Sequence, residues 1–243
     1  MCNCVRASFE FRDIRLHCDL VYDLPQFKPI YNVSPGRKEA DVLAIVRGER
    51  GNERRLMYWP LIPSFEKSMK LRYSTTNAKL ERLRESYTYK RLLQNRRCVI
   101  PVDGFYEFQG AKGSKIPWFV YLKSKEPFSL AGLWDSWKRP DGGILDSFSI
   151  ITLPPNDFMR PIHDRIPAIL HPDDEETWLN CAGNPFEKAE PLLVPFPSEE
   201  MAAHITTTRV NNSRYNEPDA GAPVEDLSSA SLGSAQGTGS RDP

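Results

Sequence analysis

The chain has little that would place it in a membrane or a disulfide-rich class. No apolar run approaches the roughly 20 residues of a membrane-spanning helix, and the first residues lack the apolar stretch of a secretory signal. Cysteine is scarce, with five residues in 243, an odd number without paired spacing. A disulfide framework is therefore not indicated. We expect a soluble protein of a reducing intracellular compartment, with no membrane partner.

Net charge is also absent, because 32 Lys and Arg residues balance 32 Asp and Glu residues. The balance is uneven along the chain. Residues 47–97 contain 14 basic against 5 acidic residues, whereas residues 171–243 contain 4 basic against 13 acidic residues. This asymmetry has two interpretations: a basic face suited to a polyanion, or two segments that fold together and neutralise each other.

Short strand-like runs are abundant, and turn residues separate them. The runs are DVLAIVR from Asp41, RRLMYW from Arg54, RCVIPVDGFYEF from Arg97, IPWFVYL from Ile116, FSLAGLW from Phe128, SFSIIT from Ser147, PLLVPF from Pro191 and HITTT from His204. The KRPDGG stretch between Trp137 and Ile144 is typical of an antiparallel hairpin turn. The pattern predicts an α+β fold of mostly antiparallel strands in a curled, barrel-like core.

Few helices are expected. Leu80, Leu83, Tyr87 and Leu92 follow a helical stripe, which predicts a helix over residues 78–93. A second helix should begin at Pro172, where acidic residues follow and complement the helix dipole. Residues 2–225 are predicted to form a single domain. Residues 226–243 are too poor in apolar groups to fold and are predicted to be a disordered Ser/Gly-rich tail.

The second residue is a cysteine, which is small enough for methionine aminopeptidases to remove Met1. Cys2 would then carry a free α-amine beside its thiol. Such a 1,2-aminothiol captures aldehydes, because the amine forms an imine and the sulfur closes a five-membered thiazolidine ring. The alternative interpretation is a cysteine that lies by chance near a frayed terminus.

Three polar residues lie where packing does not require them. Glu107 interrupts a strand-like run, and it is either solvated at a strand end or held in an apolar cleft that raises its pKa. His163 precedes the buried-looking run RIPAIL, as a structural residue or as an acid/base group. Asn77 precedes the predicted helix, where its simplest role is an N-cap.

Taken singly, these residues indicate no particular family, but their order along the chain does. The ordered set of MC, YNVSPG at Tyr31, STTNAKLE around Asn77, RRCVIPVDGFYEF and IHDRIPAIL resembles the SRAP family, the SOS-response-associated peptidases. The resemblance runs from Cys2 to about Val224. It implies a DNA-repair protein that senses abasic sites in single-stranded DNA and captures them covalently, without a cofactor, as a monomer in the cytoplasm and nucleoid or, in a eukaryotic host, the nucleus.

The resemblance also implies roles for individual residues. Cys2 would form the crosslink, Asn77 and Glu107 would line its pocket, and His163 would assist imine formation and reversal. Self-removal of Met1 accounts for the peptidase name. The implied DNA contacts are Lys79 and Arg165 to phosphates, Pro35, Phe65 and Trp59 to bases, and Asn32 and Thr152 near the DNA path. For Trp59 core packing is an equal alternative, and Asn32 and Thr152 could equally be turn or strand residues.

The chain departs from the family pattern at several positions. Asn3 and Cys4 replace the usual Gly and Arg, Pro60 replaces Gly, Phe65 and Phe108 replace Trp, and Lys79 replaces Arg, so that its charge remains but not its bidentate fork. Three other functions stay open: a Cys/His/Glu peptidase that acts only on itself, a non-covalent reader of modified DNA bases, and a zinc site of Cys2, Cys4, His17 and Cys18. The last lacks the paired spacing of structural zinc sites.

Overall fold

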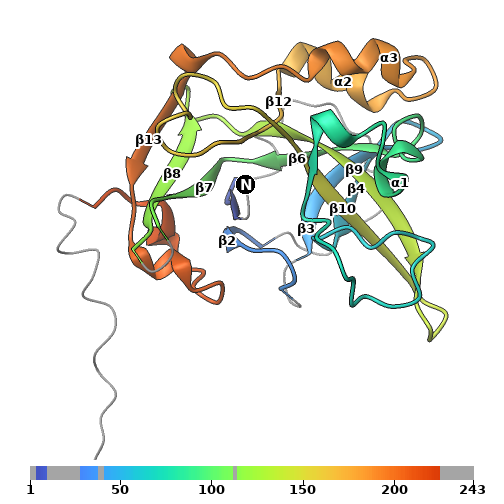
Figure 1. The fold of residues 1–243 in the computed structure, drawn as a ribbon, viewed down its shortest axis with the longest axis horizontal. Helices are drawn as coiled ribbons and strands as arrows, with labels where there is room; N and C mark the ends of the chain where they lie inside the picture. The colour runs from blue at the N-terminus through green and yellow to red at the C-terminus, as the bar shows by residue number, and fades with distance from the viewer. Residues whose placement is uncertain (1–3, 10–27, 38–40, 112–113, 225–243) are drawn as a thin grey trace, which may run out of the picture.

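The computed structural model describes residues 4–9, 28–37, 41–111 and 114–224, which form two sheets with short helices at their margins (Figure 1). The first sheet has the order β13-β8-β7-β1-β2, and all its pairs are antiparallel. Its strands are β1 (Val5–Ala7), β2 (Ile30–Val33), β7 (Gly104–Gln109), β8 (Ile116–Leu122) and β13 (Met201–Ile205). The chain therefore places its first strand beside β7, the strand that carries Glu107.

The second sheet has the order β11-β10-β9-β6-β3-β4, with β12 paired to β9 and β5 paired in parallel to β10. Its strands are β3 (Val42–Arg47), β4 (Asn52–Met57), β5 (Asn77–Lys79), β6 (Arg97–Val102), β9 (Phe128–Lys138), β10 (Ile144–Leu153), β11 (Ile166–Pro167) and β12 (Ile169–Leu170). The KRPDGG turn joins β9 to β10, where the Arg139 amide donates to the Gly143 carbonyl at 2.7 Å. The predicted hairpin is confirmed.

The expected α+β class is confirmed, and the second sheet curls as expected. Tyr58, directly after the edge strand β4, pairs with Ser147 on β10, the strand next to the other edge strand β11. The amide of Tyr58 donates to Asp146, and that of Phe148 donates to Tyr58. Within the described residues, however, neither sheet closes into a barrel. The edge strands β13 and β2 of the first sheet, and β11 of the second, each have a neighbouring strand on one side only.

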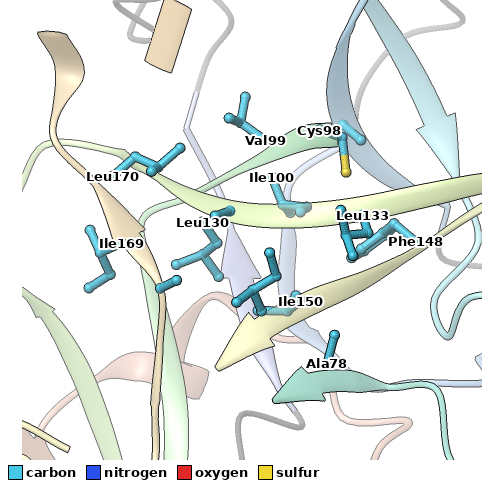
Figure 2. Packing of buried hydrophobic residues seen from close by; sticks show 14 of the residues in the cluster. Ala78, Cys98, Val99, Ile100, Leu130, Leu133, Phe148, Ile150, Ile169 and Leu170 are labelled. Atoms are coloured by element: carbon cyan, nitrogen blue, oxygen red, sulfur yellow. The ribbon is translucent and has the colours of Figure 1, made fainter. Parts of the chain in front are cut away.

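The core lies against the curled sheet. Figure 2 shows Ile100, Leu130, Ile150 and Ala78 converging from β6, β9, β10 and β5. Every residue of β6 is buried, which its continuous apolar run predicts for a central strand. Trp59 belongs to this core, since its ring stacks on Phe148 with centroids 5.9 Å apart and its indole N–H donates to the Thr76 carbonyl. The packing interpretation of Trp59 is confirmed.

The helices are short. They are α1 (Tyr87–Lys90), α2 (Glu175–Leu179) and α3 (Phe186–Ala189), with 3-10 turns at Leu80–Arg82, Pro172–Asp174, Glu190–Leu192, Ser198–Glu200, Thr208–Asn211 and Pro218–Gly221. The helix expected from Pro172 is present as a 3-10 turn that continues into α2. Both α2 and α3 lie over one end of the second sheet (Figure 1). None of the helices in the described part is long and apolar enough to cross a membrane.

Two predicted elements are wrong. Residues 78–93 do not form one helix: they begin in β5, pass through a 3-10 turn and end beyond the four-residue α1. Pairing of β5 with β10 supplies the backbone partners that a helix would have supplied, so the tertiary contact overrides the local stripe. The PLLVPF run forms no strand either, because Glu190–Leu192 is a 3-10 turn and irregular chain comes after it.

The segment after β13 is hydrogen-bonded to β2 and to the end of β13. The Asn216 side-chain oxygen accepts from the backbone amides of Tyr31 and Asn32 at 2.8 and 3.2 Å. The Thr206 hydroxyl donates to the Ala220 carbonyl at 2.6 Å, and the Val224 amide donates to Ile205 at 3.1 Å. Residues up to 224 are therefore part of the fold. The predicted tail, residues 226–243, lies outside the described residues.

Candidate active site

Glu107 is a buried carboxyl group on β7. Its side chain is 2% exposed, and its strand neighbour in register is Trp118 on β8. Removing a carboxylate from water disfavours the charged form, so burial raises the pKa of Glu107 from 4.5 to about 7. Of the two interpretations from sequence, the buried one holds. A carboxyl group with this pKa can give or take a proton near neutral pH.

His163 faces Glu107 from the turn that precedes β11. Its Nε2 lies 3.7 Å from Oε2 of Glu107. The turn is fixed at its start, where the Asn156 side-chain oxygen accepts from the Met159 amide at 2.9 Å, and the His163 amide donates to the Met159 carbonyl at 2.8 Å. Gln109, two residues after Glu107 on β7, donates to the Pro161 carbonyl at 2.7 Å. Gln109 therefore ties the turn to the strand that carries Glu107.

Glu107 and His163 do not form a charged ion pair under their pKa shifts. Burial lowers the pKa of His163 while it raises that of Glu107, so both neutral forms are favoured. The Arg165 amide donates to Nδ1 of His163 at 3.1 Å, which favours a proton on Nε2, facing Glu107. The exposed Asp164 carboxylate also lies 2.8 Å from Nδ1 and favours the opposite tautomer. The proton can thus occupy either ring nitrogen.

Asn77 and Lys79 lie on β5, where Asn77 pairs with Ile150 and Lys79 with Thr152 of β10. Asn77 is not a helix N-cap, as the local pattern suggested, because no helix begins there. Both residues line a hollow of about 400 Å³ together with Tyr73, Arg82 and Ser86. Lys79 is exposed, so its ammonium group is available to an anion in or beside this hollow.

Thr152, on β10, is the register partner of Lys79, and Arg165 directly precedes β11. Arg165 donates to the Thr152 carbonyl at 2.6 Å. Its guanidinium also donates to both carboxylate oxygens of Glu81, at 2.6 and 3.0 Å. Arg165 holds the pKa of Glu81 below its usual range by this hydrogen bonding. Thr152 is fully buried. A phosphate at Arg165 would compete with Glu81 for the same fork of donors.

Phe65 is 41% exposed in the loop after β4. Its ring packs edge-on against Tyr87 at 5.0 Å, and the guanidinium of Arg91 lies 5.1 Å from its centroid. Exposed aromatic rings beside cations are typical of single-strand nucleic-acid surfaces.

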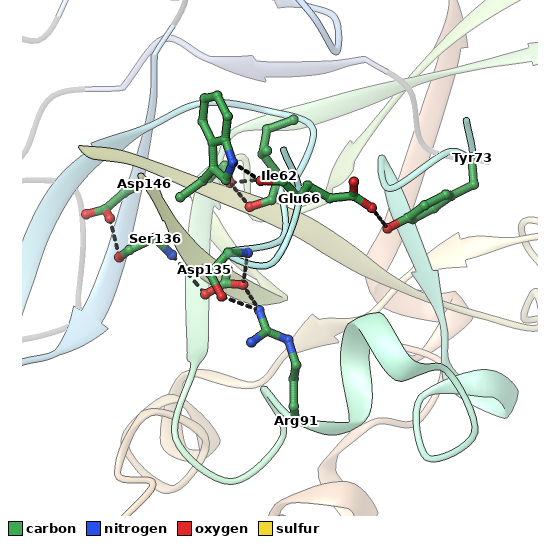
Figure 3. Close-up of polar contacts among 10 residues, drawn as sticks. Ile62, Glu66, Tyr73, Arg91, Asp135, Ser136 and Asp146 are labelled. Carbon is green, nitrogen blue, oxygen red and sulfur yellow. Dashed lines mark hydrogen bonds and ion pairs between the residues drawn. The ribbon is translucent and has the colours of Figure 1, made fainter. Parts of the chain in front are cut away.

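The loop that carries Phe65 is anchored by Asp135, a β9 residue that is 4% exposed (Figure 3). Asp135 pairs with Arg91 and accepts from the Ser64 amide at 2.7 Å. Farther along the loop, Tyr73 donates to the Glu66 carboxylate at 2.7 Å. The exposed rings are therefore held on a fixed frame.

Asn32 lies on β2 and Pro35 follows that strand, and β2 is on the side of β1 opposite β7. The Asn32 side chain is buried, and its amide donates to the carbonyls of Val210 and Asn212 at 3.2 and 3.3 Å. Its oxygen accepts from the Cys4 thiol. Pro35 is half-buried in the turn after β2. Contacts of either residue with DNA stay predictions.

Cys2 and Met1 lie outside the described residues, as do His17 and Cys18 of the alternative zinc site. Cys4 is the first described residue, and its carbonyl accepts from the Tyr106 amide at 2.9 Å, one position from Glu107. Burial raises the pKa of the Cys4 thiol to about 12. Among the residues that the structure describes, no three His, Cys, Asp or Glu side chains are grouped to hold a metal ion.

The charge asymmetry is partly resolved by pairing between the two segments. Arg47 pairs with Glu176, and Arg84 pairs with Glu187 and Glu190. Other cations of residues 47–97 stay exposed, among them Lys79, Arg82 and Lys90. Pairing between the two segments therefore accounts for part of the basic segment, and the polyanion interpretation stays a prediction for the rest.

Sequence reasoning missed four contributors: Glu81, Gln109, Asp135 and Tyr73. Tyr73 is 45% exposed in the basic stretch KLRYSTTN, and an aromatic residue among cations is a signal that could have singled it out. Glu81, Gln109 and Asp135 act through long-range contacts, which no local pattern reveals.

Comparison with known proteins shows the family of the chain. The sequence model of the SOS response associated peptidase (SRAP) family matches residues 1–213, so the chain belongs to the SRAP family. It is 35% identical over 222 residues to the abasic site processing protein YoqW of Bacillus subtilis, covering 90% of this chain and 98% of YoqW. It is 34% identical to the abasic site processing protein HMCES of Xenopus tropicalis, covering 83% of this chain and 68% of HMCES.

Solved structures share the fold. A protein from Bacteroides thetaiotaomicron matches with a TM-score of 0.69 at 27% identity, over 81% of this chain and 86% of its own. A protein from Bordetella bronchiseptica matches with a TM-score of 0.70 at 21% identity, over 85% of this chain and 100% of its own, which supports the fold alone.

Proposed function

We propose that this protein repairs DNA by processing abasic sites, which it senses in single-stranded DNA and captures through a thiazolidine formed by Cys2. The observation that carries the proposal is the buried Glu107 carboxyl, with a pKa near neutrality, 3.7 Å from His163 and on the strand that pairs with β1. Two relatives at 34 and 35% identity are abasic site processing proteins by name.

The chemistry begins with the amine of Cys2. An abasic deoxyribose opens to an aldehyde at C1′, and only a free-base amine attacks it. An α-amine has a pKa of about 8 and a lysine ammonium a pKa of about 10.4, so the terminal amine has a free-base fraction roughly two powers of ten larger at neutral pH. Cys4, two residues after Cys2 in the sequence, is hydrogen-bonded to Tyr106 on β7, the strand that carries Glu107.

Glu107 and His163 would move the protons of this sequence. The amine nitrogen adds to C1′ and gives a carbinolamine, whose hydroxyl leaves as water once neutral Glu107 protonates it. The thiol then adds to the imine carbon, gives its proton to the carboxylate and closes the ring, with net loss of one water. His163 would protonate the ring oxygen as the sugar opens. Ring closure removes an imine that promotes strand cleavage.

The flanking residues would hold the strand. Lys79 is exposed beside Asn77, and the Arg165 guanidinium has a geometry that suits a phosphate as well as Glu81. Phe65 would stack on a base. Asn77 would orient the amine or a sugar hydroxyl, since its amide both donates and accepts.

Removal of Met1 is a necessary step in this scheme, because the peptide bond to Met1 occupies the nitrogen of Cys2. We propose that the same site cleaves this bond: the Cys2 thiol attacks the Met1 carbonyl carbon, the C–N bond breaks to give a thioester and the free amine, and water then hydrolyses the thioester to release methionine, with Glu107 and His163 as proton carriers. Cell-free synthesis without methionine aminopeptidase, which would also act before alanine, tests the step: retention of Met1 in Cys2→Ala but not in the parent would implicate the thiol, and loss from both would contradict it. Intact-protein mass spectrometry separates the two forms by one methionine residue.

The main experiment mixes the purified protein with a single-stranded oligonucleotide that carries one abasic site and resolves the products on a denaturing gel. A heat-stable adduct is expected, with the mass of the two components less one water. Two controls apply: an oligonucleotide with a tetrahydrofuran abasic analogue, which has no aldehyde, and Cys2→Ala. An adduct with the analogue, or an equally stable one with Cys2→Ala, would contradict the proposal.

The same gel separates the other functions. Loss of Met1 with no adduct would indicate a peptidase that acts only on itself. Binding that survives Cys2→Ala and gives no covalent product would indicate a reader of modified bases.

A further inference from the structure

A hollow rich in arginine lies on the second sheet, whereas Glu107 belongs to the first. It has a volume of about 540 Å³ and is lined by residues of the β3–β4 hairpin, by the two residues before β6 and by Trp134 of β9. Four arginines contribute to its wall: Arg47, Arg50, Arg55 and Arg96. None of the residues placed in the candidate active site lines it. Since the whole chain has no net charge, this is a local concentration of cations.

The floor of the hollow is Trp134, which is 5% exposed. The Arg96 guanidinium lies 4.2 Å and that of Arg55 4.9 Å from the centroid of its ring. Stacking on an indole orients a planar guanidinium and leaves its N–H donors directed outward along its edges. Because Trp134 is already covered by the arginines, the hollow offers hydrogen-bond donors and no free ring for a base.

The four arginines are not equivalent. Arg55 is fixed by Glu53 at 2.8 Å and Asp146 at 3.0 Å, and Arg47 is paired with Glu176. Neither Arg50 nor Arg96 forms an ion pair with any carboxylate in the part of the chain that the structure describes. Arg50 is exposed at the hairpin tip and Arg96 is half-buried. The hollow therefore presents two arginines that form no ion pair with a described carboxylate, beside Glu49 and Glu53 in the same lining.

The hairpin is shaped to hold this arrangement. Gly48 donates to the Gly51 carbonyl at 2.8 Å across the turn. A Cβ at Gly48 would lie 1.8 Å from Oε1 of Glu53, so glycine gives that carboxylate room beside the turn in the position from which it reaches Arg55. Gly51 has a φ of 146°. Glu53 is therefore engaged with Arg55, on the same face as the hairpin turn.

We propose that this hollow binds the phosphodiester backbone of a nucleic acid, through Arg50 and Arg96, at nucleotides outside the segment held at the candidate active site. Guanidinium forks match phosphate oxygens, and a hollow of this size is larger than one phosphate group. With its ring covered, Trp134 reads no base, so the contact is independent of sequence. The inference extends the proposed function, since both sites would engage one strand.

The test measures non-covalent binding of unmodified single strands of about 10 and about 30 nucleotides across a salt series. For the Arg50→Gln/Arg96→Gln variant, the slope of log K against log salt for the long strand is expected to fall by about 1.4, at roughly 0.7 for each lost phosphate contact. Binding of the short strand should not change. The matched control is Arg139→Gln, an exposed arginine of the β9–β10 hairpin.

A gain-of-binding variant guards against misfolding. Glu49→Gln removes an exposed carboxylate from the wall of the hollow and should strengthen long-strand binding, a result that a folding defect cannot produce. Equal slopes for the parent, the double variant and Arg139→Gln would overturn the proposal. A second result would also overturn it. If inorganic phosphate at constant ionic strength displaces the strand, and the long strand binds no more tightly than the short one, the hollow binds a free anion and not a nucleic acid.

The two proposals fail separately. Adduct formation on a short abasic oligonucleotide depends on Cys2 and does not involve Arg50 or Arg96. A protein that forms no adduct but shows the length-dependent slope would retain the hollow and lose the abasic-site chemistry.

Discussion

Oε2 of Glu107 lies 3.7 Å from Nε2 of His163, and the two residues reach this distance from separate parts of the fold. Glu107 is on β7 of the first sheet, and His163 is in the turn before β11 of the second. Gln109 joins the two through its hydrogen bond to Pro161. The site is therefore built between the sheets, from one strand and one turn that a single side chain holds together.

The raised pKa of Glu107 predicts how stability changes with pH. Between its ordinary pKa of 4.5 and its folded pKa of about 7, the folded protein binds more protons than the unfolded chain. The free energy of unfolding therefore falls as pH rises through this window. Glu107→Gln stays neutral, so relative to the parent it should gain about 2 to 3 kcal/mol between pH 5 and pH 8.

Urea unfolding of both proteins at pH 5 and pH 8 measures this difference. The same variant should form the adduct roughly 100-fold more slowly, the usual loss for a proton-transfer group. A constant stability difference at the two pH values would show that Glu107 titrates as an ordinary carboxyl.

Glu81 should restrain DNA binding. Arg165 is held by the Thr152 carbonyl at 2.6 Å as well as by Glu81, so it should keep its place when Glu81 becomes neutral. In Glu81→Gln the guanidinium is freed for a phosphate, and unmodified single strands should bind more tightly, as fluorescence anisotropy would show. The matched control is Asp157→Asn, which removes a carboxylate from the exposed pair with Arg160. Weaker binding in Glu81→Gln would mean that Glu81 orients Arg165.

Asp135 should fix the loop that carries Phe65. Its buried carboxylate accepts from the Ser64 amide and pairs with Arg91 (Figure 3), so Asp135→Asn breaks a partly buried ion pair and should cost about 2 to 4 kcal/mol. Limited proteolysis should then cut within residues 63–73 sooner than in the parent. Asp141→Asn, at an exposed hairpin turn, is the control. Unchanged cleavage would place the anchor of this loop elsewhere.

Cys4 should not compete with Cys2 for an aldehyde or an alkylating agent. With a pKa of about 12, only about one Cys4 thiol in ten thousand is ionised at pH 8, and the side chain is 2% exposed. Iodoacetamide treatment of the folded protein, followed by peptide mass spectrometry, should label the half-buried Cys181 before Cys4. Early labelling of Cys4 would show that β1 opens readily.

Local signals predicted the parts of the fold that local chemistry determines. Pro172 and the acidic residues after it predicted the start of a helix, and alternating or continuous apolar runs predicted β3, β6, β8, β9 and β10. The stripe from Leu80 to Leu92 failed because β10 pairs with Asn77–Lys79, so that the only α-helix in this stretch is the four-residue α1. Strands as short as β11 and β12 have too few residues for any pattern to stand out.

The site was predictable in its residue types but not in its contacts. Glu107 and His163 were candidates because polar groups interrupted apolar runs, and the resemblance to the SRAP family joined them. Nothing local indicated that Glu81 would hold Arg165 or that Asn32 would be buried against Cys4, because these contacts join segments far apart in the sequence.

The family's sequence model stops at residue 213, whereas the fold continues to Val224. Most partners that the last residues offer are main-chain groups, such as the carbonyl of Ala220 and the amide of Val224. Most substitutions leave main-chain groups intact, although Asn216 and Asp219 also act through their side chains. A truncation guided by sequence likeness alone would leave the amides of Tyr31 and Asn32 without their acceptor on Asn216 and weaken the edge of the first sheet.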